Sequence, residues 1–147
     1  MSRRCRAAFL LLVLATVGCT APSAPSYISA EFVLTDVDGH PLPTGSPPSV
    51  GRPGPSIVSG SMALDQGGGA YISENRMDSN GTLYAVTNVY TYGIKYSQIK
   101  FEVPCPPGLT CPPGPTGEIL DNGLRVQVVF PPNYPFTIYN FRTVPRS

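Results

Sequence analysis

The chain has 147 residues, a length that suits one domain, and its ten Lys and Arg against nine Asp and Glu give a formal net charge of +1. Without an excess of positive charge, nucleic-acid binding is not expected. A single His leaves little material for His-based catalysis or a His-rich metal site.

The first nineteen residues have the order of a secretory signal. Arg3, Arg4 and Arg6 form a positive start, and an uncharged run follows from residue 7 to Cys19. A membrane-spanning helix needs about 20 apolar residues, so this run is too short to span comfortably. It fits the apolar core of a signal helix that is cleaved from the mature protein.

The run ends in Thr16-Val17-Gly18-Cys19, which resembles the lipobox of bacterial lipoproteins. The resemblance implies that Cys19 receives a diacylglycerol thioether and that residues 1–18 are removed as a signal peptide. Thr16 departs from the Leu that is usual at its position. The protein would then be lipid-anchored through Cys19 on the extracytoplasmic side of the bacterial cell envelope. The alternative is an ordinary signal peptide cleaved nearby, with Cys19 incidental.

Removal of 18 of the 147 residues leaves 129, and three cysteines remain among them: Cys19, Cys105 and Cys111. If Cys19 carries lipid, the other two form the only pair, in a compartment that permits disulfides. We therefore predict a structural Cys105–Cys111 disulfide, because zinc needs four ligands and a redox motif would have the spacing C-x-x-C. Residues 19–26 form a lipidated Cys and a Pro/Ser/Ala tether, which leaves residues 27–147 for the folded domain.

The rest of the chain shows the alternation of short β-strands. In residues 27–35, Phe32 and Leu34 fall on one side and Glu31 and Val33 on the other, which predicts a half-buried strand. Further strands are predicted over residues 56–64, 70–73 (a short edge strand), 82–91, 94–103, 124–130 and 136–143. Tyr92-Gly93 is expected to separate two of them. Turns are expected at residues 36–39, 80–81 and 122–123, and Pro/Gly-rich loops at 41–55 and 104–117. About seven antiparallel strands predict one small all-β domain, a β-sandwich of prealbumin-like or Ig-like type.

Two turn segments carry a family resemblance. Residues 35–43 (TDVDGHPLP) resemble the opening hairpin of carboxypeptidase-regulatory-like domains, which are similar to transthyretin, and residues 77–83 (MDSNGTL) resemble their later turn and strand. The resemblance implies a prealbumin-like sandwich that serves as an accessory or binding module rather than a catalyst. The loops at 41–55 and 104–117 depart from the family pattern.

The candidate sites are few. Asp36 and Asp38 could offer oxygens to calcium, but a full calcium loop needs about six ligating positions, and turn formation explains both carboxylates; we predict no metal and no cofactor. The aromatic set is more suggestive, since Tyr84, Tyr90, Tyr92 and Tyr96 have the same parity along the strands. An exposed strip of these rings would bind glycans or a protein. Alternatively, each Tyr is simply a good strand residue.

The pattern as a whole favours a non-catalytic, membrane-anchored surface lipoprotein that acts as a binding or assembly module with an envelope protein partner. Two alternatives are a glycan-binding module that uses the Tyr-rich face to hold a polysaccharide, and an enzyme with an unrecognised site.

Overall fold

The computed structural model describes residues 25–44, 55–132 and 137–144, and these build one antiparallel β-sheet. Its elements are β1 (Ala30–Val37), β2 (His40–Pro41), β3 (Ser56–Leu64), β4 (Gly69–Met77), β5 (Leu83–Lys95), β6 (Gln98–Glu102), β7 (Thr116–Leu120), the 3-10 turn η1 (Asp121–Gly123), β8 (Arg125–Val129) and β9 (Ile138–Thr143). The predicted signal peptide, Cys19 and most of the tether lie outside the described residues. The described part of the chain contains no apolar helix of membrane-spanning length.

The sheet closes on itself. β3 pairs with β1, each strand from β4 to β9 pairs with the one before it, and β9 pairs back to β1. Residues 30–33 of β1 bond to β3, while residues 32–37 bond to β9, so both edges of β1 are used. Eight strands therefore form an antiparallel barrel, to which the β1–β2 hairpin adds one short extra strand.

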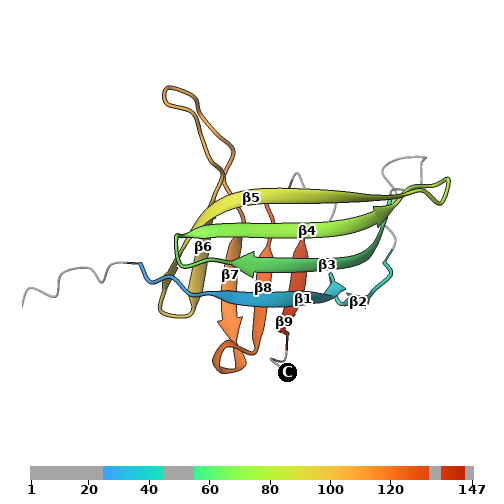
Figure 1. Cartoon of the computed structure of the whole chain (residues 1–147), viewed down its shortest axis with the longest axis horizontal. Helices are drawn as coiled ribbons and strands as arrows, with labels where there is room; N and C mark the ends of the chain where they lie inside the picture. Colours follow the sequence, from blue (N-terminus) through green and yellow to red (C-terminus); the bar gives the residue numbers. More distant parts are fainter. Residues whose placement is uncertain (1–24, 45–54, 133–136, 145–147) are drawn as a thin grey trace, which may run out of the picture.

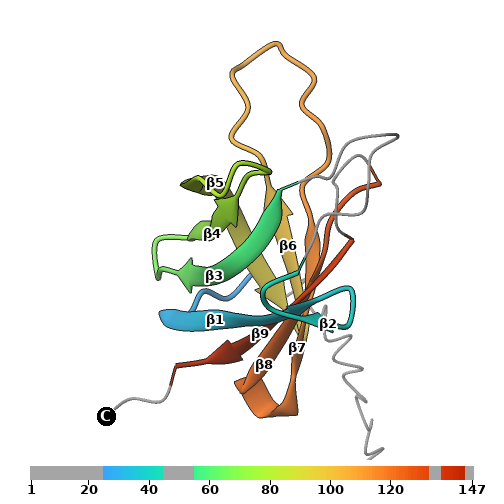
Figure 2. The same ribbon diagram turned by 90° about the vertical axis from the view of Figure 1, so that its right-hand side faces the viewer.

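The closed barrel replaces the two-sheet sandwich that the sequence predicted, while the all-β class is confirmed. The strands β1, β3, β4 and β5 lie side by side in one layer, and β6 to β9 cross them in another (Figures 1 and 2). β5 runs without a break through Tyr92-Gly93, where two strands were expected. It pairs with β4 over residues 83–91 and with β6 over residues 91–95. One long strand thus carries the sheet from one layer into the other, and register shifts in β1 and β3 add the twist that closure needs.

The barrel interior is filled by alternate side chains of the strands. The largest fully buried side chains include Phe32, Phe101, Tyr139 and Phe141. An eight-stranded barrel is just wide enough for side chains to fill it, and here the buried side chains of the strands form one hydrophobic core cluster. Exposed functional groups must therefore sit at the ends of the barrel, on its outer face or in its loops.

Candidate functional site

The connection between β6 and β7 projects from the barrel as a long loop (Figures 1 and 2). The predicted Cys105–Cys111 disulfide is confirmed, and it closes the outer part of this loop with the two Cα atoms 5.9 Å apart. We call residues 103–115 the disulfide loop. It contains six prolines and no charged residue.

The tip of the disulfide loop is a tight turn. The Leu109 N–H donates to the carbonyl oxygen of Pro106 at 3.3 Å, and Gly108 has φ +84°. Pro107 followed by a glycine with positive φ is the signature of a type II turn. The turn leaves the Leu109 side chain 67% exposed, although leucine is a side chain that folding normally removes from water.

The base of the disulfide loop is fixed to the barrel. The Phe101 N–H donates to the Pro115 carbonyl at 3.1 Å, and Pro115 is buried. Gly114 packs so closely on the Phe101 backbone that a Cβ there would lie 2.2 Å from the Phe101 carbonyl oxygen. A fixed base, a covalent bridge and six prolines leave the loop few conformations, so a partner would meet it already ordered.

The N-terminal segment hydrogen-bonds to the edge of β5 beyond Thr91, where the pairing with β4 ends. We call the contacts of residues 26–28 with Tyr92 and Ile94 the N-terminal clip. Ser26 and Ile94 exchange backbone hydrogen bonds of 3.0 and 3.1 Å. The Tyr92 hydroxyl accepts from the Ile28 N–H at 2.8 Å and lies 2.7 and 2.9 Å from the carbonyl oxygens of Ile28 and Asp65. Burial raises the pKa of Tyr92 above its usual value, so the hydroxyl stays protonated and holds these bonds.

Beside this clip lies an open pocket of about 440 Å³. Its lining includes Tyr27 and Tyr92, the glycines of the β3–β4 turn, and Lys95, Lys100 and Glu102 from β5 and β6. The Lys100 Nζ lies 2.8 Å from Glu102 Oε1, and both side chains are largely exposed. The pocket thus combines aromatic surface with one carboxylate and two ammonium groups.

The four tyrosines expected to share an outer face do not do so. Tyr90 and Tyr92 are buried inside the barrel, Tyr84 is 41% exposed at the far end of β5, and Tyr96 is exposed in the β5–β6 turn. The parity argument fails because the shared face of Tyr90 and Tyr92 is the inner one, where Ile94 continues the same alternation. Tyr27 was placed at the start of the strand predicted over residues 27–35 and was not singled out; in the structure it precedes β1 and its ring is exposed.

A charged pair lies in the barrel interior. Glu74 and Arg76 follow Ala70 and Ile72 on the inner face of β4, and Arg76 Nε donates to Glu74 Oε2 at 2.7 Å. Glu74 is 2% exposed and Arg76 is half-buried. Tyr139 of β9 hydrogen-bonds with this pair, and its pKa is raised far above the usual value, chiefly by burial and then by the charge of Glu74. These three side chains satisfy one another, so the cluster serves as an internal support of the fold.

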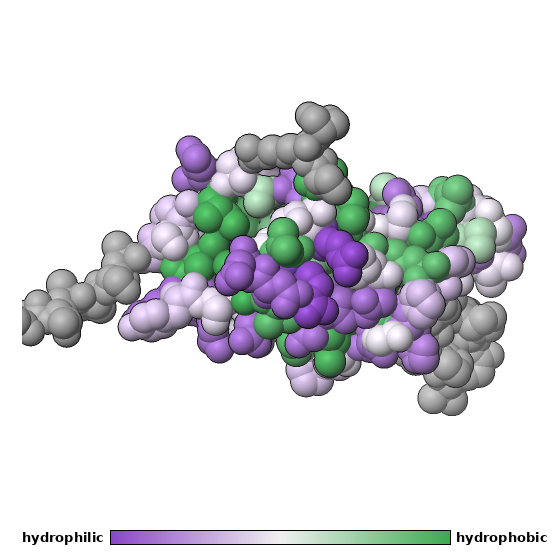
Figure 3. All heavy atoms as spheres, turned by 90° about the horizontal axis from the view of Figure 1, so that it is seen from below, coloured by the Kyte–Doolittle hydropathy of each residue, from purple (hydrophilic) through white to green (hydrophobic). Residues whose placement is uncertain are grey.

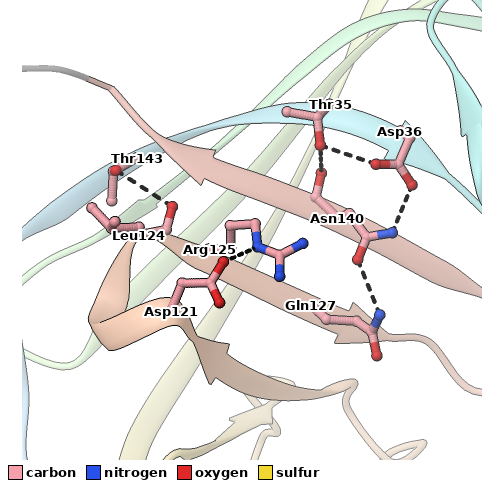
Figure 4. A network of polar contacts seen from close by, with 8 residues as sticks. All are labelled: Thr35, Asp36, Asp121, Leu124, Arg125, Gln127, Asn140 and Thr143. Carbon is pink, nitrogen blue, oxygen red and sulfur yellow. Dashed lines mark hydrogen bonds and ion pairs between the residues drawn. The ribbon is translucent and has the colours of Figure 1, made fainter.

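The turn carboxylates considered for calcium hold strands together. Asp36 Oδ1 accepts from Asn140 Nδ2 at 2.6 Å, and Figure 4 shows how this bond joins a chain of polar contacts across β1, β9 and β8. Asp38 Oδ1 accepts from the Ile138 N–H at 2.7 Å. No three His, Cys, Asp or Glu side chains of the described segments come together as a metal site.

On the underside of the barrel, hydrophilic side chains gather in the middle and hydrophobic patches lie on either side (Figure 3).

Comparison with known proteins gives no relative: no protein-family model, no curated protein and no solved structure matches the chain significantly.

Proposed function

We propose that this chain is a non-catalytic surface lipoprotein of the bacterial cell envelope, anchored through Cys19, whose barrel presents the disulfide loop to a protein partner. The observation that carries the proposal is the loop itself, which is exposed, uncharged and fixed at its base. Because buried side chains fill the barrel interior, a partner would have to bind on the outside of the molecule.

The anchor is supported by the order of the first nineteen residues and by the cysteines. Arg3, Arg4 and Arg6 precede the apolar run, and Gly18 stands directly before Cys19. Cys105 and Cys111 are bonded to each other, and Cys5 would leave with the signal peptide. Cys19 is then the remaining cysteine of the mature chain, available for lipid. The disulfide itself is typical of an oxidising compartment such as the periplasm or the cell surface.

The chemistry of the disulfide loop suits a protein partner. Leu109 and the surrounding prolines offer apolar contact area without a charge that a partner would have to desolvate. An ordered loop loses little conformational entropy on binding, so more of the contact energy appears as affinity. The exposed Leu109 is the side chain best placed to fill a pocket on the partner.

Site-specific photocrosslinking in intact cells tests the proposal. A photoreactive amino acid replaces Leu109 in one variant and, as a matched control, Leu124 in another, which is 60% exposed after η1. We expect one dominant crosslinked protein from position 109 and none at comparable yield from position 124. The same pattern of products from both positions, or no protein product from position 109, would contradict the proposal.

A further inference from the structure

The pocket beside the N-terminal clip has the size of a small-ligand site and is separate from the disulfide loop. Its volume of about 440 Å³ lies within the range of roughly 300–1,000 Å³ that is usual for such sites. Three parts of the chain that are far apart in sequence form its wall: the N-terminal segment with Tyr27, the β3–β4 turn with Gly68, and the strands β5 and β6.

The Tyr27 ring is both held in place and open to solvent. It meets the Tyr92 ring edge to face, with centroids 5.7 Å apart and an interplanar angle of 86°. The ring also lies directly against Gly68, since a Cβ there would be 3.0 Å from Tyr27 Cε1. Any larger residue at position 68 would push the ring away. Tyr27 is nevertheless 46% exposed, so part of a fixed aromatic surface faces the solvent.

A fixed and exposed tyrosine ring is a stacking surface. The face of an aromatic ring carries partial negative charge, and the C–H groups of a pyranose carry partial positive charge, so the two attract. Because the neighbours of Tyr27 already hold the ring, stacking orders few additional torsions and costs little entropy.

The polar wall of the pocket adds the hydrogen-bonding groups that sugar hydroxyls need. Glu102 can accept and Lys100 can donate, and the two already lie 2.8 Å apart. Lys95 supplies a second ammonium group, so the lining carries two positive charges and one negative charge. This balance favours a ligand that carries one carboxylate over a neutral ligand of the same shape.

We propose that this pocket binds an acidic saccharide, with a sugar ring stacked on Tyr27, its hydroxyls bonded to Lys100 and Glu102, and its carboxylate near Lys95. The glycan-binding function thus rests on Tyr27 rather than on the four tyrosines expected from the sequence. The inference does not depend on the lipid anchor or on the disulfide loop.

The test is a titration of the purified, ¹⁵N-labelled full chain followed by amide chemical shifts. The probe is the disaccharide N-acetylglucosaminyl-N-acetylmuramic acid, which bears one carboxylate, and the comparison is di-N-acetylchitobiose, which has none. We expect saturable shifts of the Gly67, Gly68 and Gly93 amides, with tighter binding of the acidic sugar. Tyr27→Ala should weaken binding by about tenfold, which corresponds to the loss of one aromatic stacking contact.

Two control variants keep the result specific. Tyr84→Ala removes a ring of similar exposure at the far end of β5 and should leave the affinity unchanged. Lys95→Met should reduce the preference for the acidic sugar while chitobiose binding persists. The proposal is overturned if neither sugar shifts these amides, or if Tyr27→Ala and Tyr84→Ala bind the acidic sugar equally well. Crosslinking at Leu109 is read separately, so failure here leaves the partner-binding proposal intact.

Discussion

Replacement of Arg76 by Met tests how the barrel tolerates a carboxylate in its interior. The substitution keeps the aliphatic part of the side chain and removes the guanidinium group that lies 2.7 Å from Glu74. Glu74 is only 2% exposed, so in the variant its carboxylate keeps the Tyr139 hydroxyl as a neighbour but loses its counter-ion in a place that water does not reach. Breaking a buried ion pair from one side costs about 3–5 kcal/mol, and we expect about 4 kcal/mol for Arg76→Met.

Substitution of the other partner, Glu74, should lower the free energy of unfolding by less. Glu74→Gln leaves Arg76 unpaired, but 17% of the Arg76 side chain is exposed and retains contact with water. We expect a cost of about 2 kcal/mol, because the glutamine amide also keeps one hydrogen-bond acceptor near Arg76. The double variant removes both charges at once. Its cost should therefore be smaller than the sum of the two single costs by about 2 kcal/mol or more.

Urea unfolding at pH 7 and 25 °C, followed by far-UV circular dichroism, gives the three free energies of unfolding. An unchanged m-value shows that the surface exposed on unfolding is the same in each variant. Equal costs for the two single variants would refute the argument from exposure. A double variant whose cost equals the sum of the single costs would refute the pairing of Glu74 with Arg76.

Three further outcomes follow from the structure. Tyr92→Phe should lower the free energy of unfolding by about 1–2 kcal/mol and speed amide exchange at Ile28, because the clip loses its hydroxyl; unchanged exchange would contradict this. Folding raises the pKa of Tyr139, so the contribution of its neutral hydroxyl to the free energy of unfolding is complete below about pH 10 and falls by about 1.4 kcal/mol per pH unit above it. In urea unfolding, the free energy of unfolding of Tyr139→Phe should therefore fall less steeply above pH 10 than that of the wild type. Cys19→Ala should release the protein from membranes and abolish labelling by fatty acid; a wild type that sediments with membranes but takes up no label would refute lipidation.

The strands with regular alternation were predictable from the sequence. β3 has the predicted bounds of residues 56–64, and in β1 the inward positions Phe32 and Leu34 are as expected. The turn predicted over residues 36–39 is confirmed in a shorter form. β1 continues through Val37, and only Asp38 and Gly39, both with positive φ, lie between the paired Val37 and His40. Local patterns sufficed at these places because one face of each strand meets the core.

One strand is longer than predicted, and another was not predicted. β4 was expected to be a short edge strand over residues 70–73; Glu74 and Asn75, which follow, are of types depleted in strands. In the structure Glu74 and Arg76 satisfy each other inside the barrel, so the strand continues to Met77 between β3 and β5. β7 is not among the predicted strands, and only its first two residues fall in the loop expected over residues 104–117. Its pairing with β8 is a tertiary contact that its own composition does not reveal.

No local pattern in the sequence indicates that the sheet closes into a barrel. The β1–β9 ladder joins residues such as Val33 and Arg142, which are more than one hundred positions apart in the chain. The candidate site was predictable only in part. The disulfide followed from counting cysteines, whereas the pocket at Tyr27 depends on the clip between Ser26 and Ile94, and no pattern in the sequence pairs those two residues.

Crosslinking from position 109, compared in cells with and without the disulfide, tests whether a partner recognises the ordered disulfide loop. In the chain-entropy model, a bridge across so short a loop removes about 2 kcal/mol of conformational entropy from the unfolded chain, and the same bridge limits the conformations open to the folded loop. The Cys105→Ser/Cys111→Ser variant should keep the circular dichroism spectrum of a folded barrel at 25 °C. If the ordered loop is what the partner recognises, the yield of the specific product should fall by about tenfold in that variant. An undiminished yield would contradict the account.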